Sequence, residues 1–249
     1  MPRPYDESFF ADIAPQAARS ARRIVPEIAA LLAPRSVVDV GCGTGVWLRE
    51  FVGAGADRIL GIDGAHVVTA DLVIPPESFM TADLEAPVPL AERFDLAMSL
   101  EVAEHLSPSS GLALIELLTR AAPAVLFSAA LPGQGGRHHV NEQWLDHWVG
   151  QFEREGFEAI DCIRRRFWDD ADVTSYYAQN AVLFLAADHP AAPAARALSQ
   201  PLPWRVVHPG TLEHTARPRG LGDLIREVPA ALRRTVAARR GSAPVAPRG

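Results

Sequence analysis

Short apolar runs alternate with amphipathic stretches along most of the chain. Seven β-branched or continuously apolar runs predict strands, at 36–40, 58–62, 79–81, 94–99, 124–128, 158–163 and 181–186. Apolar residues at helical spacing predict helices at 7–32, 46–53, 109–122 and 141–155. The first of these forms one or two helices, with an interruption near Pro26. Strands that alternate with helices predict an α/β fold: a doubly wound, mostly parallel seven-stranded sheet with an N-terminal helical cover.

The pattern changes after residue 186. Residues 187–249 contain nine of the 21 prolines and no strand pattern. We therefore expect one domain at 1–186 and an irregular tail at 187–249, partly helical or disordered, with a basic amphipathic helix at 220–234. The tail is either a flexible appendage or an element that covers a substrate or joins subunits.

Charge and cysteine content narrow the class of protein. The chain has 249 residues and a net charge of −6, and only four of its 30 acidic residues lie after residue 186. The acidic 1–186 region would repel phosphate backbones, which argues against a nucleic-acid partner. Two cysteines cannot build a disulfide framework, so we expect a reducing, cytoplasmic compartment. We expect neither a signal peptide nor a membrane span, because no apolar run approaches about 18 residues.

A glycine-rich loop, Gly41-Cys42-Gly43-Thr44-Gly45, joins the first strand to a helix. Glycines there let backbone N–H groups approach a ligand closely, and the helix N-terminus adds a positive dipole end. Asp39, at the end of the strand, is a buried carboxylate that a ligand ammonium group could partner. Asp63 ends the second strand, where it could accept both ribose hydroxyls of a nucleoside. Val46 replaces the third glycine of the NAD fingerprint, which argues against a dinucleotide.

The string DVGCGTG resembles the first motif of the class I S-adenosylmethionine (SAM) methyltransferases, which have a Rossmann-like fold. The resemblance covers roughly residues 1–186 and implies SAM as cofactor. It implies that Gly41, Gly43 and Gly45 pass under the methionine end of SAM, whose ammonium group Asp39 helps to hold, and that Asp63 holds the ribose.

Two later segments match the same family. Thr81-Ala82-Asp83-Leu84 is similar to the adenine motif. In that motif Asp83 would accept from the exocyclic amine and the Leu84 N–H would donate to a ring nitrogen. Read without the family, Asp83 is a loop aspartate that caps a turn. Leu100, at the end of the fourth strand, is also expected to contact the cofactor.

Acidic and imidazole side chains follow the fourth strand. If this stretch makes one helical turn, Glu101, Glu104 and His105 project from one face. Two carboxylates beside an imidazole need a cation or a proton between them, and this donor set suits Mg²⁺ or Mn²⁺. The Glu-x-x-Glu-His string is similar to one in small-RNA 3′-terminal ribose methyltransferases and in ubiquinone-pathway O-methyltransferases. That resemblance implies His139 as a further ligand.

Three interpretations of this string remain open. It holds a metal, it supplies His105 or His139 as a metal-free base, or it is structural. Among the other candidates, Arg164-Arg165-Arg166 is expected to form an exposed edge. Four residues before the last strand either line the acceptor pocket or pack: Tyr176, Tyr177, Gln179 and Asn180.

The leading hypothesis is a SAM-dependent O-methyltransferase that acts on a hydroxyl of a small molecule, such as a sugar or aromatic diol. One alternative is an RNA 2′-O-methyltransferase, which only the arginine-rich tail favours. Another is a non-catalytic SAM-binding module, and a fourth is an NAD-dependent reductase.

Overall fold

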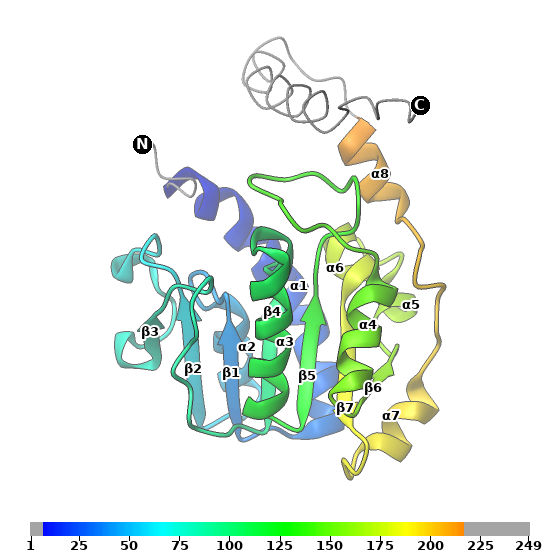
Figure 1. Cartoon of the computed structure of the whole chain (residues 1–249), viewed down its shortest axis with the longest axis horizontal. Helices are drawn as coiled ribbons and strands as arrows, with labels where there is room; N and C mark the ends of the chain where they lie inside the picture. Colours follow the sequence, from blue (N-terminus) through cyan, green and yellow to red (C-terminus); the bar gives the residue numbers. More distant parts are fainter. Residues whose placement is uncertain (1–6, 217–249) are drawn as a thin grey trace, which may run out of the picture. The chain divides into compact units, whose positions relative to one another are not determined.

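The computed structural model describes residues 7–216 and contains one mixed sheet with helices on both faces (Figure 1). The strands are β1 (Ser36–Val40), β2 (Arg58–Asp63), β3 (Phe79–Thr81), β4 (Leu96–Leu100), β5 (Ala124–Ser128), β6 (Phe157–Ile160) and β7 (Val182–Ala186). The α-helices are α1 (Glu7–Leu32), α2 (Val46–Gly53), α3 (Pro108–Ala121), α4 (Leu145–Arg154), α5 (Arg164–Phe167), α6 (Ser175–Asn180), α7 (Ala192–Leu198) and α8 (Pro209–Ala216). Three 3₁₀ turns lie at Thr69–Asp71, Pro76–Ser78 and Ala103–His105.

The sheet has the strand order β3-β2-β1-β4-β5-β7-β6. All neighbours pair in parallel except β7, which is antiparallel to both β5 and β6. The expected doubly wound, mostly parallel seven-stranded sheet is therefore confirmed. The strand order reverses between β1 and β4, and in such sheets ligands bind beyond the carboxyl ends of the strands at that point.

Side chains of alternate strand residues divide the core between the two faces of the sheet. Val37, Leu96 and Leu126 pack with α1, α2 and α5–α7, whereas Val38 and Ala97 pack with α3 and α4. In Figure 1 the parallel strands rise toward the long loop that follows β5. None of the helices within 7–216 has both the length and the hydrophobicity needed to cross a bilayer.

Helix α1 corrects one sequence expectation, because it continues through Pro26 without a break. Ile24 and Val25 on one side of the proline and Ile28 on the other are all buried in the same cluster as α2. Their burial offsets the cost of a proline inside a helix, which is about 3 kcal/mol.

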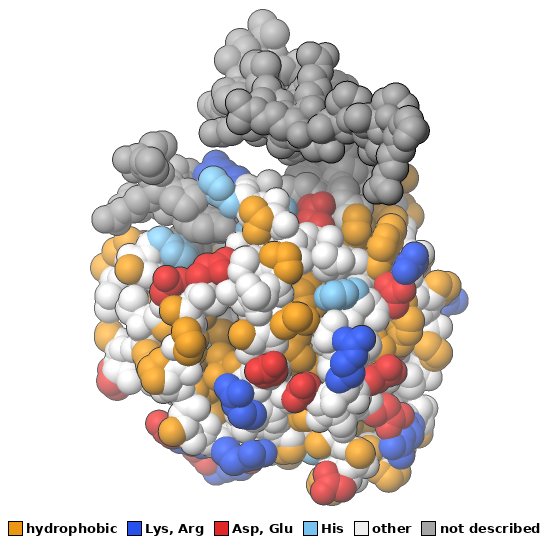
Figure 2. All heavy atoms as spheres, in the orientation of Figure 1, with side chains coloured by type: hydrophobic (Ala, Val, Ile, Leu, Met, Phe, Trp, Pro, Cys, Tyr) orange, Lys and Arg blue, Asp and Glu red, His pale blue; other side chains and the backbone are white. Residues whose placement is uncertain are grey.

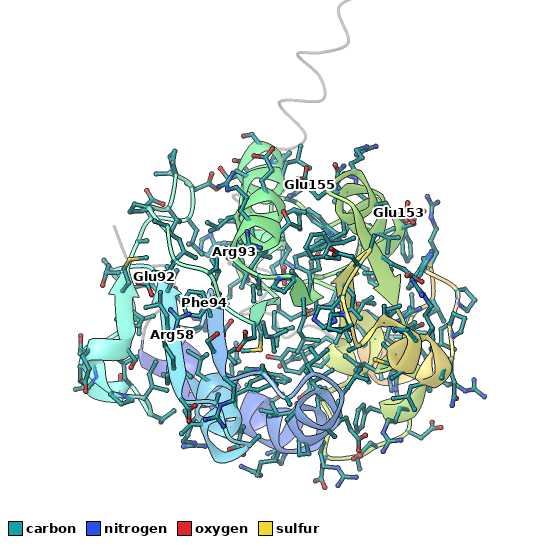
Figure 3. All side chains as sticks on the ribbon, turned by 90° about the horizontal axis from the view of Figure 1, so that it is seen from below. Arg58, Glu92, Arg93, Phe94, Glu153 and Glu155 are labelled. Atoms are coloured by element: carbon teal, nitrogen blue, oxygen red, sulfur yellow. The ribbon has the colours of Figure 1, made fainter. Side chains whose placement is uncertain are left out.

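The amino ends of the strands carry a surface contact that links β2 to the start of β4. The Arg58 guanidinium lies 4.2 Å from the centre of the Phe94 ring, and its Nη1 donates to Glu92 Oε2 at 2.6 Å. It also donates to the Arg93 carbonyl. Figure 3 shows these residues together, viewed from the end of the sheet opposite the loop after β5.

The segment after β7 is attached to the domain by Arg164, which is fully buried and not part of an exposed edge as expected. Its guanidinium pairs with Asp161 at 2.6 Å and donates to the carbonyls of Leu202 and Pro203. Asp161 in turn accepts from the Leu202 N–H at 2.8 Å. A buried charge needs hydrogen-bond partners. Leu202 and Pro203 accept two of the four hydrogen bonds that the Arg164 guanidinium donates, and Asp161 accepts the other two. Helices α7 and α8 flank these residues within the stretch expected to be an irregular tail. Residues 217–249, with the helix expected at 220–234, lie outside the described part.

Replacing Arg164 tests this attachment. Arg164→Ala leaves the Asp161 carboxylate buried without its cation and two carbonyls without donors, so we expect a loss of about 3–5 kcal/mol in the free energy of unfolding. Arg165→Ala, at the exposed neighbour, is the matched control and should change it by less than about 0.5 kcal/mol. Urea unfolding of both variants measures the difference. Equal effects would contradict the structural role of Arg164.

Candidate functional site

The glycine loop between β1 and α2 has a backbone that only glycine adopts without strain. Gly41, Gly43 and Gly45 have φ values of +87°, +54° and +84°. A Cβ at Gly41 would lie 2.3 Å from Val102, and one at Gly45 would lie 2.8 Å from Ile74. The loop therefore presents backbone at the carboxyl edge of the sheet, as expected for a cofactor cradle.

Asp39 lies beneath this loop and is 2% exposed. Burial raises the pKa of its carboxyl to about 8, and the charge of nearby Asp63 adds to the rise. Such a group favours a cation beside it. The contact expected between Asp39 and the α-ammonium of SAM stays a prediction.

Asp63, at the end of β2, also organises the glycine loop. Its Oδ2 accepts from the Gly43 N–H at 2.7 Å, and its Oδ1 accepts from the Gly64 N–H at 2.6 Å. His66 Nε2 lies 3.2 Å from the same Oδ1. Each carboxylate oxygen has two acceptor sites. The contact with Gly43 is a role that the sequence did not suggest, and the role of Asp63 in ribose binding stays a prediction.

Asp83 and Leu84 follow β3. Asp83 is exposed and its Oδ1 accepts from the Glu85 N–H at 3.0 Å, which is the turn-capping contact of a loop aspartate. Leu84 is half-buried against the core on the α3 side. Leu100, the last residue of β4, is buried in the core on the other face. The adenine and cofactor contacts expected of these three residues stay predictions.

Glu101 corrects the expectation that one helical turn starts there. Its φ is +57°, and the 3₁₀ turn begins only at Ala103. Its carboxylate accepts from Gln134 Nε2 at 2.7 Å and from Asn180 Nδ2 at 3.1 Å. Burial raises the pKa of Glu101 to about 7, although these two donors oppose the rise. The left-handed backbone directs Glu101 to the amides of Gln134 and Asn180.

Glu104, His105 and His139 do come together. Within the described chain they form the one group of three or more possible ligands, with ligand atoms all within 4.8 Å of one another. The His105 and His139 rings meet edge to face with centroids 4.8 Å apart. Glu104 is 1% exposed, and its Oε2 is buried with no hydrogen-bond donor.

The electrostatics of this group suit a cation. Burial, followed by the charge of Glu101, raises the pKa of Glu104 well above its usual range. Burial, followed by His139, lowers the pKa of His105 to about 4, so its imidazole is neutral near pH 7. The group offers a divalent cation one carboxyl oxygen without a donor and two imidazoles. This set contains less oxygen than the one expected for Mg²⁺ or Mn²⁺, because amide groups occupy Glu101.

Three amide side chains around Glu101 form a buried network. Gln134 Oε1 accepts from Gln179 Nε2 at 3.2 Å and from Asn180 Nδ2 at 3.0 Å. Gln179 Oε1 accepts from the His208 N–H at 2.7 Å, which connects the network to the segment before α8. No role for Gln134 was expected from the sequence, because nothing in the local pattern marks this residue.

Glu142 is a second residue that the sequence analysis left without a role. Its Oε1 lies 2.8 Å from His139 Nδ1. Although partial burial raises the pKa of its carboxyl, hydrogen bonds from Gly133, His139 and Gly135 lower it overall. The spacing of His139 and Glu142, three residues apart after a glycine cluster, was the available signal.

Comparison with known proteins identifies the family. The family described as Methyltransferase domain matches residues 13–171. The tRNA U34 carboxymethyltransferase of Stutzerimonas stutzeri (strain A1501) is 27% identical over 187 residues, which cover 66% of this chain and 55% of that protein. The ubiquinone biosynthesis O-methyltransferase of Methylobacterium sp. (strain 4-46) is 34% identical over 82 residues, covering 30% and 32%. The chain thus spans about half the length of the first relative and about a third of the second.

A solved structure agrees on the fold. The magnesium protoporphyrin IX methyltransferase from Synechocystis PCC 6803, determined with bound SAM, has a TM-score of 0.50 and 20% identity. The match covers 71% of this chain and 83% of that one. With the sheet order and glycine loop described above, the chain belongs to the methyltransferase domain family, as a class I SAM-dependent methyltransferase domain.

Proposed function

We propose that the protein transfers the methyl group of SAM to a hydroxyl oxygen of a small-molecule acceptor. The observation that carries this proposal is the group Glu104, His105 and His139. Its residues follow the carboxyl ends of β4 and β5, the edge of the sheet where such folds bind ligands. A hydroxyl is a weak nucleophile at neutral pH, and this group offers the means to activate it.

The SAM sulfonium is a strong electrophile, so the protein mainly positions the acceptor oxygen in line with the methyl carbon. The O–CH₃ bond forms as the CH₃–S bond breaks, which leaves a methyl ether, S-adenosylhomocysteine and the hydroxyl proton. In the absence of a cation, the imidazole of His105 or His139 would accept that proton. With a cation bound, these rings are ligands and the proton leaves to solvent.

Glu104, His105 and His139 would hold the divalent cation, and a bound Mg²⁺ or Mn²⁺ would lower the pKa of the acceptor hydroxyl. The orphaned Oε2 of Glu104 supports a cation. Glu101 is left out of this proposed ligand set because two amide groups already occupy its carboxylate.

The cofactor would bind across the glycine loop. Asp39 would hold its ammonium group, Gly41, Gly43 and Gly45 would lie under the methionine end, and Asp63 would hold the ribose. The left-handed glycines and the raised pKa of Asp39 support this placement. Asp83, Leu84 and Leu100 are proposed to surround the adenine end.

Two observations indicate the chemical class of the acceptor: the names of the two relatives and the charges on the protein surface. The O-methyltransferase named above favours a small-molecule hydroxyl, whereas the tRNA enzyme favours RNA as a second candidate. On the α3 and α4 face, acidic and basic side chains lie side by side (Figure 2). Such a mixed surface does not form the basic patch that RNA backbones require, so we favour the small molecule.

The acceptor and the cation are tested together with tritiated SAM and three acceptors: a sugar, a catechol and a short RNA. We expect transfer to a small molecule that chelation by EDTA suppresses and Mn²⁺ restores. Glu104→Gln should lower the rate by about 10²-fold or more, because the cation loses its carboxylate. Glu153→Gln, on the exposed face of α4, is the control and should keep wild-type activity. Transfer to RNA alone would favour the second candidate, and activity that resists EDTA would reject the cation in favour of a histidine base.

The pKa of Asp39 predicts how SAM binding depends on pH. Below pH 8 the ligand-free carboxyl carries a proton that must leave before it can pair with the ammonium group. Affinity for SAM should therefore rise by up to about tenfold per pH unit between about pH 6 and about pH 7.5. Asp39→Asn should weaken binding by about tenfold or more and flatten this dependence, as measured by calorimetry.

The ligand-free Asp39→Asn variant supplies the control for folding. Because its folded pKa is raised, the Asp39 carboxyl makes the wild type less stable as pH rises toward 8, and asparagine removes that charge. The variant should unfold at the same or a higher temperature than the wild type at about pH 7.5. A parallel pH dependence of SAM affinity in the two proteins would contradict the role of Asp39.

A further inference from the structure

The carboxylate of Glu142 makes three polar contacts with the loop that follows β5. Its Oε2 accepts from the Gly133 N–H at 2.8 Å, and its Oε1 accepts from the Gly135 N–H at 3.0 Å. The third contact joins the same Oε1 to His139 Nδ1 at 2.8 Å. The side chain of Glu142 therefore contacts both the glycines near the start of the loop and His139 near its end.

The glycines of this loop are shaped for that contact. Gly133 and Gly135 have φ values of +86° and +71°, which let their N–H groups converge on one carboxylate. Gly136 leaves room for the ring itself, because a Cβ there would lie 2.1 Å from His139 Nε2. The His139 imidazole therefore lies between the backbone of Gly136 and the Glu142 carboxylate, which Gly133 and Gly135 hold in place.

The backbone beyond His139 is attached directly to Glu104. The N–H groups of Val140 and Asn141 both donate to the Glu104 carbonyl, at 2.8 and 3.0 Å. Asn141 Nδ2 also donates to the Ala103 carbonyl at 3.3 Å. The peptide chain thus places His139 beside the 3₁₀ turn, and the side chain of Glu142 contacts its ring.

The hydrogen bond also decides which ring nitrogen carries the proton. A neutral imidazole has one N–H donor and one lone pair, and an ionised carboxylate only accepts. Two backbone donors already point at the Glu142 carboxylate, so the contact with Nδ1 requires the hydrogen on Nδ1. The lone pair is then on Nε2.

We propose that Glu142 is a positioning residue that holds His139 in the Nδ1–H form and so leaves Nε2 as the atom that binds the cation or accepts the proton. This inference rests on the proposed function of His139. A carboxylate in this place fixes the ring orientation and increases the electron density at Nε2, as carboxylates behind ligating histidines do in metal sites.

The first test reads the tautomer of His139 directly, in the metal-free protein of residues 1–249 labelled with nitrogen-15 histidine, at about pH 8 where an ordinary imidazole is neutral. We expect the wild type to carry the proton on Nδ1. In Glu142→Ala the proton should move largely to Nε2, the form an imidazole prefers in water. If the alanine variant folds poorly, Glu142→Gln replaces it in this test, because glutamine keeps the size of the side chain. In Glu142→Gln we expect a population of the Nδ1–H form between those of the wild type and the alanine variant.

The second test measures Mn²⁺ affinity of the same proteins by calorimetry. Glu142→Ala should bind Mn²⁺ about 10–100-fold more weakly than the wild type, because the ligating ring loses its partner. Glu153→Ala is the matched control: it removes the same charge from an exposed position that points outward (Figure 3) and should match the wild type.

The outcomes separate this inference from the proposed function. A wild-type His139 with its proton on Nε2, or a Glu142→Ala variant that keeps the Nδ1–H form, would overturn the role of Glu142. If the wild type binds no Mn²⁺, the proposed cation is wrong, and the tautomer in the wild type and in Glu142→Ala still decides whether Glu142 positions the ring.

Discussion

Buried carboxyl groups at the carboxyl edge of the sheet are the constraint on which this site depends. Burial raises the pKa of Asp39, of Glu101 and of Glu104. A carboxylate persists in such surroundings only beside hydrogen-bond donors or a cation. The amides of Gln134 and Asn180 donate to Glu101. In the proposed function, the cationic end of SAM would pair with Asp39 and a divalent ion would pair with Glu104.

In the loop after β5, backbone N–H groups stabilise the partly buried carboxylate of Glu142. Left-handed glycines turn two N–H groups toward its carboxylate, which stays ionised next to His139. Between these two glycines lies Gln134, whose amide donates to the Glu101 carboxylate. One short, glycine-rich segment therefore connects the carboxylate at the end of β4 with the imidazole that would act on the acceptor.

The segment after β7 belongs to the same arrangement. Arg164 holds residues 200–204 through buried hydrogen bonds, and His208 donates to Gln179 in the amide network. The Gln179 amide then contacts Gln134. Hydrogen bonds thus connect the segment beyond β7 to the residues around Glu101, so this segment contributes to the structure of the site.

The sequence by itself determined the seven strands and helices α1 to α4 in chain order and the position of the glycine loop. Those features depend on hydrophobic periodicity and on backbone angles that only glycine adopts, and both are local properties of the chain. Tertiary structure decided that α1 continues through Pro26, that Arg164 is buried and that amides of Gln134 and Asn180 occupy the Glu101 carboxylate. It also brought Gln134 and Glu142 to the site. Each of these depends on partners distant in the sequence or on the path of a loop, and local pattern carries no information about which donor will meet which buried charge.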